Sequence, residues 1–131
     1  MPEGARTTGQ GFGRVLVAVY GIFALAATAR SVVQLATRLD EAPVAYLLSA
    51  FAAVIYIVAT VALARGDRTS RRVATVAISI ELVGVLLVGT ASLVLPDAFP
   101  AASVWSGFGS GYGFVPLVLP FVGLWWLHRT R

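Results

Sequence analysis

The stretch 44–64 contains 21 consecutive residues without a charged side chain. At 1.5 Å per residue, a helix of this length extends about 31 Å, which matches the hydrocarbon core of a bilayer. Lipid offers no hydrogen-bonding partner to the backbone, so a segment in it must satisfy its own amide groups, as an α-helix does. This stretch predicts that the chain crosses a membrane.

Three further apolar runs extend over 15–37, 73–95 and 111–127. The fourth is short, because even a helix over 110–127 would extend only about 27 Å, and Pro120 is expected to kink it near its middle. We predict an all-α fold, a transmembrane four-helix bundle that forms one membrane domain over 1–131. A re-entrant or interfacial segment is the alternative for the fourth run.

The composition of the whole chain agrees with a lipid environment. Hydrophobic residues make up 58% of the 131 positions, charged residues only 12%, and the mean hydropathy is +0.85. A soluble domain carries roughly a quarter charged residues, so this chain has too little charge to cover a surface that faces water. We predict a multi-pass protein of the cell (plasma) membrane.

Arginines at the ends of the apolar runs predict the topology. The basic loop 65–72 holds four arginines against one aspartate, and further arginines lie before the first run and after the fourth. The loop 96–110 holds Asp97 and no arginine. By the positive-inside rule, the polar tail 1–11, the loop 65–72 and the C-terminus are cytoplasmic (N-in/C-in), and 96–110 is an outer loop.

The first apolar run also has features of a cleavable signal peptide. Arginines precede an apolar stretch over 15–29 that ends in Ala-Thr-Ala, an A-x-A pattern. Apolar residues resume after Arg30, which favours an uncleaved membrane anchor.

Glu81 is predicted to lie near the bilayer midplane, because it comes about 13 Å into the third run. An acid at this depth costs roughly 2.5–3.5 kcal/mol on insertion scales and normally faces the protein interior. It shares a helix face with the small residues Ala77 and Gly84, where another helix can approach closely.

Arg30 is the expected partner of Glu81, because a long arginine side chain, with one water, can span the difference in depth between the two residues. Gln34 could extend this polar centre by one turn, and Tyr20 and Tyr56 could join it. Three interpretations remain open: an ion pair that sets helix register, a proton- or ion-coupling site, and an acid that is protonated or hydrogen-bonded alone.

Aromatic and glycine residues alternate in and after the outer loop, which suggests a surface for contact. Trp105, Phe108, Tyr112 and Phe114 form the candidate surface, as a lipid-anchored lid or an extracellular contact, with a short helix on the outer leaflet over 100–105. The Gly-Tyr-Gly at 111–113 invites comparison with the potassium filter, but neither the residues before it nor the short loop fit a pore.

Chemistry-bearing residues are scarce. There is no cysteine and a single histidine, His128, so neither a thiolate nor a zinc site can be assembled. The acids of the loops are too scattered for a catalytic pair, and no nucleotide-binding or hydrolase motif is present. We predict no enzyme activity and no cofactor, and no nucleic-acid partner, because the arginines lie where they set topology.

The runs TARSVVQLATRLDEAPVAYLLSAFAAVIYIVATVAL, ELVGVLLVGT and VWSGFGSGYGFVPLVLPFVGLWWL resemble a family of small uncharacterised four-span integral membrane proteins from actinobacteria, over about 13–127. The resemblance implies the topology and no mechanism. Small multidrug-resistance transporters are also four-helix chains of similar length with one membrane-embedded glutamate. Theirs lies in the first helix, whereas Glu81 lies in the third.

These observations predict a non-enzymatic small membrane protein that acts through contacts. Its expected partners are membrane lipid and a membrane protein, which could be a second copy of this chain in a homo-oligomer. The alternative function is a small proton- or ion-coupled transporter centred on Glu81.

Overall fold

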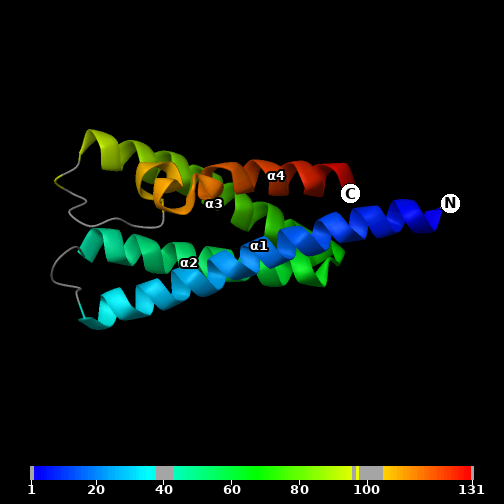
Figure 1. Ribbon diagram of the computed structural model, residues 1–131, viewed down its shortest axis with the longest axis horizontal. Helices are drawn as coiled ribbons and strands as arrows, with labels where there is room; N and C mark the ends of the chain where they lie inside the picture. The colour runs from blue at the N-terminus through cyan, green and yellow to red at the C-terminus, as the bar shows by residue number, and fades with distance from the viewer. Residues whose placement is uncertain (1, 38–42, 96, 98–104, 131) are drawn as a thin grey trace.

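The computed structural model describes residues 2–37, 43–95, 97 and 105–130, and all the regular elements of this described part are helices. The elements are α1 (Pro2–Thr37), α2 (Pro43–Arg65), α3 (Arg68–Val94), the 3₁₀ segment η2 (Ser106–Tyr112) and α4 (Val115–Thr130). The helices run along one long axis, and both chain ends lie at the same end of the molecule (Figure 1). We call this the terminal end and the opposite one the loop end.

Three helices are long and apolar enough to cross a membrane, over Gly11–Thr37, Tyr46–Arg65 and Arg68–Val94. These agree with the first three predicted spans. The large apolar side chains that remain exposed occur on all four α-helices, as expected where lipid rather than water covers the exterior.

The fourth predicted span, 111–127, is a bent pair of helices. η2 and α4 meet at 96°, and together they satisfy the length and hydropathy of a fourth crossing as a broken span or a re-entrant loop. The bend does not lie at Pro120, which is inside a continuous α4. It lies at Gly113 and Phe114, which both adopt positive φ, 64° and 60°.

Two predicted segment boundaries differ from the structure. α1 begins at Pro2, so 2–11, predicted as a polar tail before the membrane span, is helical. α3 begins at Arg68, so only Gly66 and Asp67 of the predicted loop 65–72 lie between helices. The predicted short helix over 100–105 falls mostly outside the described residues.

The turn between α2 and α3 explains why α3 starts early. Gly66 adopts φ 71°, a left-handed conformation that glycine tolerates best. Asp67 is then the N-cap of α3, accepting hydrogen bonds from the Ser70 hydroxyl (2.6 Å) and backbone N–H (3.3 Å). These bonds hold the pKa of Asp67 below its ordinary value. All four loop arginines therefore lie on helices, Arg65 at the end of α2 and the other three at the start of α3.

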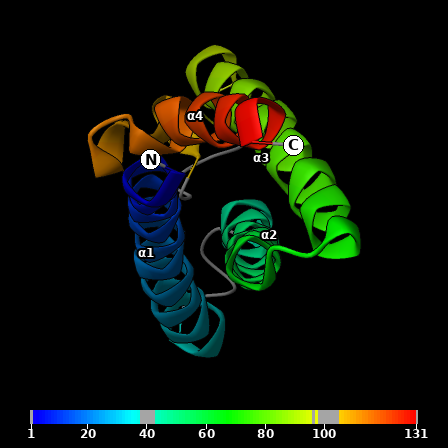
Figure 2. The ribbon, with the colours of Figure 1, turned by 90° about the vertical axis from the view of Figure 1, so that its right-hand side faces the viewer.

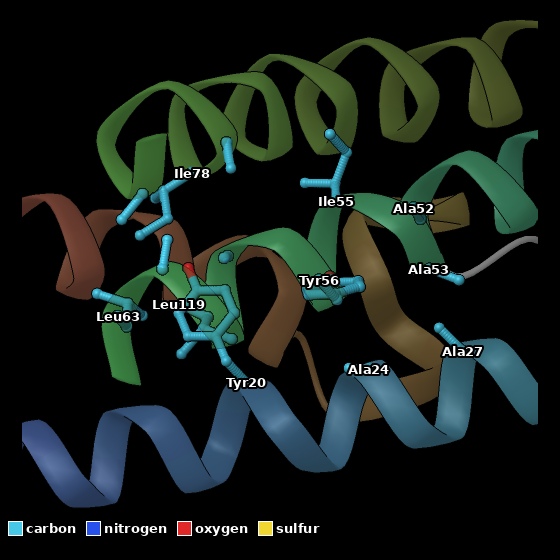
Figure 3. Packing of buried hydrophobic residues seen from close by; sticks show 14 of the residues in the cluster. Tyr20, Ala24, Ala27, Ala52, Ala53, Ile55, Tyr56, Leu63, Ile78 and Leu119 are labelled. Carbon is cyan, nitrogen blue, oxygen red and sulfur yellow. The ribbon is translucent and has the colours of Figure 1, made fainter. Parts of the chain in front are cut away.

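Figure 2 shows the arrangement from the terminal end, with α2 lying between α1 and α3, and α4 between α1 and α3 on the other side. Small side chains line the contact between α1 and α2, where Ala53 points toward Ala27 and Ala24 lies on the same face of α1 (Figure 3). Such residues let helix backbones approach closely in a membrane. These small residues of α1 and α2 thus pack against each other within the chain.

At the terminal end α4 packs on α1. The indole ring of Trp126 covers Gly13, where a Cβ would come within 2.7 Å of the ring. The neighbouring Trp125 makes an edge contact with Phe12, with ring centroids 5.8 Å apart. These contacts place the C-terminal part of α4 beside the N-terminal half of α1.

Candidate functional site

Glu81 lies fully buried in the middle of α3, as the sequence predicts for an acid that faces the protein interior. Its Oε1 accepts a hydrogen bond of 2.7 Å from the hydroxyl of Tyr20, which is also fully buried and comes from α1. Figure 3 shows the Tyr20 ring reaching from α1 toward Leu119 and Ile78. The bond therefore joins α1 and α3 across the apolar core.

Tyr56 on α2 completes the centre. Its buried hydroxyl lies near the Glu81 carboxyl and accepts a hydrogen bond of 3.1 Å from the indole N–H of Trp105. The rings of Tyr20 and Tyr56 lie 6.1 Å apart, and Phe23 lies 5.8 Å from Tyr56. The centre is thus one carboxyl group held among aromatic side chains from α1, from α2 and, with Trp105, from the start of the segment before α4.

The second carboxyl oxygen of Glu81, Oε2, is buried and accepts no hydrogen bond from the described residues. A buried polar atom without a partner costs free energy. Each such atom is a candidate for a function that uses its free lone pairs, such as proton binding.

Arg30 does not pair with Glu81. Its Nη1 donates a hydrogen bond of 3.3 Å to the hydroxyl of Tyr112 in η2. Arg30 lies ten residues beyond Tyr20 on α1, which places it about 15 Å nearer the loop end. Tyr20 lies at the depth of Glu81 and donates directly to its carboxyl group. Glu81 therefore needs no arginine and water to reach it from further along α1.

Gln34 lies one turn beyond Arg30, and both line a shallow hollow on α1 toward the loop end. Its Oε1 is buried without a hydrogen-bond partner, as are the hydroxyls of Thr28 and Ser31 on the same helix. The predicted group of Arg30, Gln34 and Glu81 is therefore split into two polar regions. Tyr20 and Tyr56 belong to the first, and Arg30 and Gln34 to the second.

Most of the predicted outer contact surface is turned inward. Trp105 is only 1% exposed and its ring lies against Gly84 of α3. Phe108 lies against Gly89, and the ring of Tyr112 lies 5.5 Å from that of Phe23. At Gly84 and Gly89, α3 thus accepts aromatic rings of the segment before α4.

Phe114 is the exception, because half of its side chain is exposed. It follows Gly113, and the two residues form the turn into α4: their N–H groups donate to the carbonyls of Ser110 and Gly109. The Gly-Tyr-Gly at 111–113 therefore ends η2 and starts this turn.

An unusual backbone holds the inward-facing rings in place. Gly107, Phe108 and Gly109 are all left-handed, with φ of 58°, 61° and 80°. A non-glycine residue in this region costs roughly 1–2 kcal/mol. The contact of Phe108 with Gly89 and a 2.8 Å hydrogen bond from the Gly107 N–H to the Ser92 hydroxyl offset this cost.

Sequence reasoning missed the covering of Gly84 and Gly89 by aromatic rings. The alternating glycines and aromatics in and after the predicted outer loop indicated an unusual backbone, but not which face of α3 the aromatic rings would meet. It also missed the link between α3 and α4 that Arg71 makes at the terminal end. The helical spacing of Arg68, Arg71 and Arg72 indicates one basic face of α3, but not that Arg71 bonds to Leu127 and Thr130 of α4.

No group of three or more metal-ligating side chains lies together in the part of the chain that the structure describes. Comparison of the chain with protein-family models, with curated proteins and with solved structures finds no match. The resemblance to small actinobacterial membrane proteins stays a prediction from the sequence.

Proposed function

We propose that this chain is a non-enzymatic, four-helix protein of the plasma membrane, with both termini in the cytoplasm, that acts through contacts with lipid or with a protein partner. The observation that carries this proposal is that the buried polar centre joins helices to each other. Glu81 is fully buried, and its hydrogen bond from Tyr20 joins two helices. The buried polar side chains thus hold helices together, and this leaves the surface of the protein for contacts with lipid or a partner.

The segment 105–112, which the proposed topology places on the outer side, supports the same proposal, because it is bound to three helices at once. Trp105 donates to Tyr56 of α2, Tyr112 accepts from Arg30 of α1, and the Gly107 N–H donates to Ser92 of α3. A segment tied down in this way presents one fixed surface. Such a surface suits recognition of a partner better than the opening and closing that transport requires.

The topology is part of the proposal, and the chain suits a direct test because it contains no cysteine. A single cysteine is introduced at Thr8 or at Thr130 and labelled in intact cells with a membrane-impermeant maleimide. N-in/C-in predicts labelling only after the cells are opened. Labelling of either end in intact cells would contradict the proposed topology.

The alternative function, a small proton- or ion-coupled transporter, is favoured by one observation. Oε2 of Glu81 is buried without a described partner, and an intramembrane carboxyl group with a free oxygen is a typical proton-binding group in transporters.

Two substitutions at the hydrogen bond between Tyr20 and Glu81 separate these functions. Glu81→Gln removes the ionisable group but keeps an oxygen that accepts from Tyr20, whereas Tyr20→Phe removes the donor and keeps the carboxyl group. Contact function predicts that Tyr20→Phe lowers stability more than Glu81→Gln does. It also predicts that neither variant changes proton entry into vesicles under an imposed pH gradient and membrane potential.

Proton entry that the wild-type protein supports and the folded Glu81→Gln variant lacks would contradict the contact proposal and favour transport. Empty vesicles measure the background leak. Equal proton entry for wild-type protein, variants and empty vesicles supports the contact proposal.

A further inference from the structure

A groove of about 1130 Å³ lies at the terminal end, between the first turns of α3 and the last turns of α4. Arg68, Arg71 and Arg72 line it from α3, and His128 lines it from α4. Among the described residues that line it, none is acidic. The groove is therefore a concave surface of positive charge.

Helix geometry brings the three arginines to one side. Positions 68, 71, 72, 75 and 76 follow the spacing i, i+3, i+4, i+7 and i+8, which is one face of an α-helix. All five line the groove. The face is basic where α3 begins and becomes apolar one turn further along, at Val76, which is 59% exposed.

Arg71 fixes the shape of the groove. Its Nη2 donates 2.9 Å to the carbonyl of Leu127 and 2.6 Å to the hydroxyl of Thr130, and its guanidinium group lies 5.4 Å from the centre of the Trp126 ring. These bonds join α3 to α4 and satisfy a carbonyl of the last turn of α4. Arg71 thus forms part of the groove wall and holds α3 and α4 together.

Arg68 and Arg72 are exposed and stay available for a ligand. The nearest described acid in the sequence, Asp67, is used elsewhere: it caps Ser70, and its Oδ1 lies 3.9 Å from Nε of Arg65. Two arginines that face a groove without a described acid beside them are a typical site for a phosphate group.

The apolar part of the groove indicates which kind of phosphate-containing molecule fits. Val76 and Leu124 extend the groove from its basic end toward the middle of α3 and α4, the part of the molecule that the proposed topology places among the hydrocarbon chains. A free anion would contact only the basic end, whereas a phospholipid offers a phosphate and an acyl chain in the same order as the groove. Basic pockets between membrane helices bind anionic headgroups in this way.

We propose that this groove binds one anionic phospholipid, with its phosphate group at Arg68 and Arg72 and an acyl chain along Val76 and Leu124. The proposal rests on the proposed contact function and names its partner as a lipid. Arg71 positions the two helices and is not counted among the lipid-binding residues.

The test measures lipid binding to detergent-purified, lipid-stripped protein by native mass spectrometry. Phosphatidylglycerol is titrated against phosphatidylcholine for the wild-type protein and two double variants. The groove variant is Arg68→Gln with Arg72→Gln. The control, Arg14→Gln with Arg65→Gln, removes the same charge outside the groove. Circular dichroism and thermal unfolding confirm that all three proteins are folded.

We expect the wild-type protein to bind phosphatidylglycerol more tightly than phosphatidylcholine. The groove variant should lose about 25-fold in affinity for phosphatidylglycerol, because each arginine facing an anionic headgroup contributes about fivefold. The control should stay within about twofold of the wild-type value. Equal affinity for the two lipids, or an equal loss in both double variants, would overturn the proposal.

Competition separates the lipid from other anions. Inorganic phosphate or glycerol phosphate that displaces phosphatidylglycerol at comparable concentration would assign the groove to a free phosphate and overturn the lipid proposal. Displacement by polyglutamate would assign it to an acidic protein segment, with the same consequence. Lipid binding is measured without reference to proton flux, so this proposal and the contact function can fail separately.

Discussion

Replacing Gly84 with alanine places a methyl group where the indole ring of Trp105 lies. An ideal Cβ at this position would come within 2.7 Å of Cη2 and 2.9 Å of Cε3 of the ring, and nearer still to Cζ3. Trp105 is 1% exposed, so the ring has no free space to move into. Either the ring or α3 must shift.

The expected cost follows from two opposing effects. Overpacking a buried site typically costs about 1–3 kcal/mol, whereas glycine to alanine inside a helix gains up to about 1 kcal/mol. Gly21→Ala on α1 provides the control, because its Cβ would lie 3.7 Å from Cγ2 of Thr60, an ordinary contact. The helix-propensity gain cancels between the variants, so Gly84→Ala should be about 1–3 kcal/mol less stable than Gly21→Ala.

The assay is unfolding in mixed micelles by increasing mole fraction of dodecyl sulfate, followed by circular dichroism. A double-mutant cycle with Trp105→Leu identifies the cause, because a smaller side chain leaves room for the methyl group. Gly84→Ala should cost little in the Trp105→Leu background. Equal stability of Gly84→Ala and Gly21→Ala, or the same cost of Gly84→Ala in both backgrounds, would refute the steric reasoning.

Three further changes test other parts of the structure. Tyr20→Phe removes the donor of a buried 2.7 Å hydrogen bond to a carboxyl group and should lower the free energy of unfolding by about 1.5–3 kcal/mol; no loss in the same unfolding assay would show that the bond contributes nothing net. Ser70→Ala removes the shorter of the two bonds that depress the pKa of Asp67, so that pKa should rise toward 3.8, as followed by carboxyl-carbon NMR. A carboxyl group whose pKa is depressed in the folded state stabilises the fold at pH values above its ordinary pKa. This contribution is lost as the pH falls through the folded-state pKa. Ser70→Ala should therefore reduce the loss of stability in acid. Gly113→Ala should cost about 1–2 kcal/mol through its positive φ alone, whereas Gly111→Ala should be close to neutral, because its Cβ would meet open space and its backbone lies outside the left-handed region.

The positions of the first three spans were predictable from the sequence because lipid imposes a simple rule on each segment separately. A stretch such as 44–64 must be helical whatever lies beside it, since lipid satisfies no backbone amide. The same rule placed Glu81 in the interior. This rule did not predict the helical start at Pro2 or the early start of α3. Polar residues lie outside the membrane region, and hydropathy does not report where their helix begins.

The partners of the buried polar groups were only partly predictable. Tyr20 was named as a possible member of the centre, whereas Arg30 was expected to pair with Glu81 and instead donates to Tyr112. Depth along a helix can be counted from the sequence, but the tilt and rotation of each helix cannot. These two quantities decide whether a side chain meets its partner, as a change of one residue turns a helical side chain by about 100°.

The sequence by itself therefore determined that the chain is helical with segments long and apolar enough to cross a membrane, that Glu81 faces inward, and that arginines gather at the ends of its apolar runs. Each of these follows from the transfer of single residues or segments into lipid. The tertiary structure alone decided that Tyr20 satisfies Glu81, that Trp105 covers Gly84, and that Arg68 and Arg72 face a groove beside α4. These contacts join residues distant in the chain, and their geometry depends on how whole helices pack.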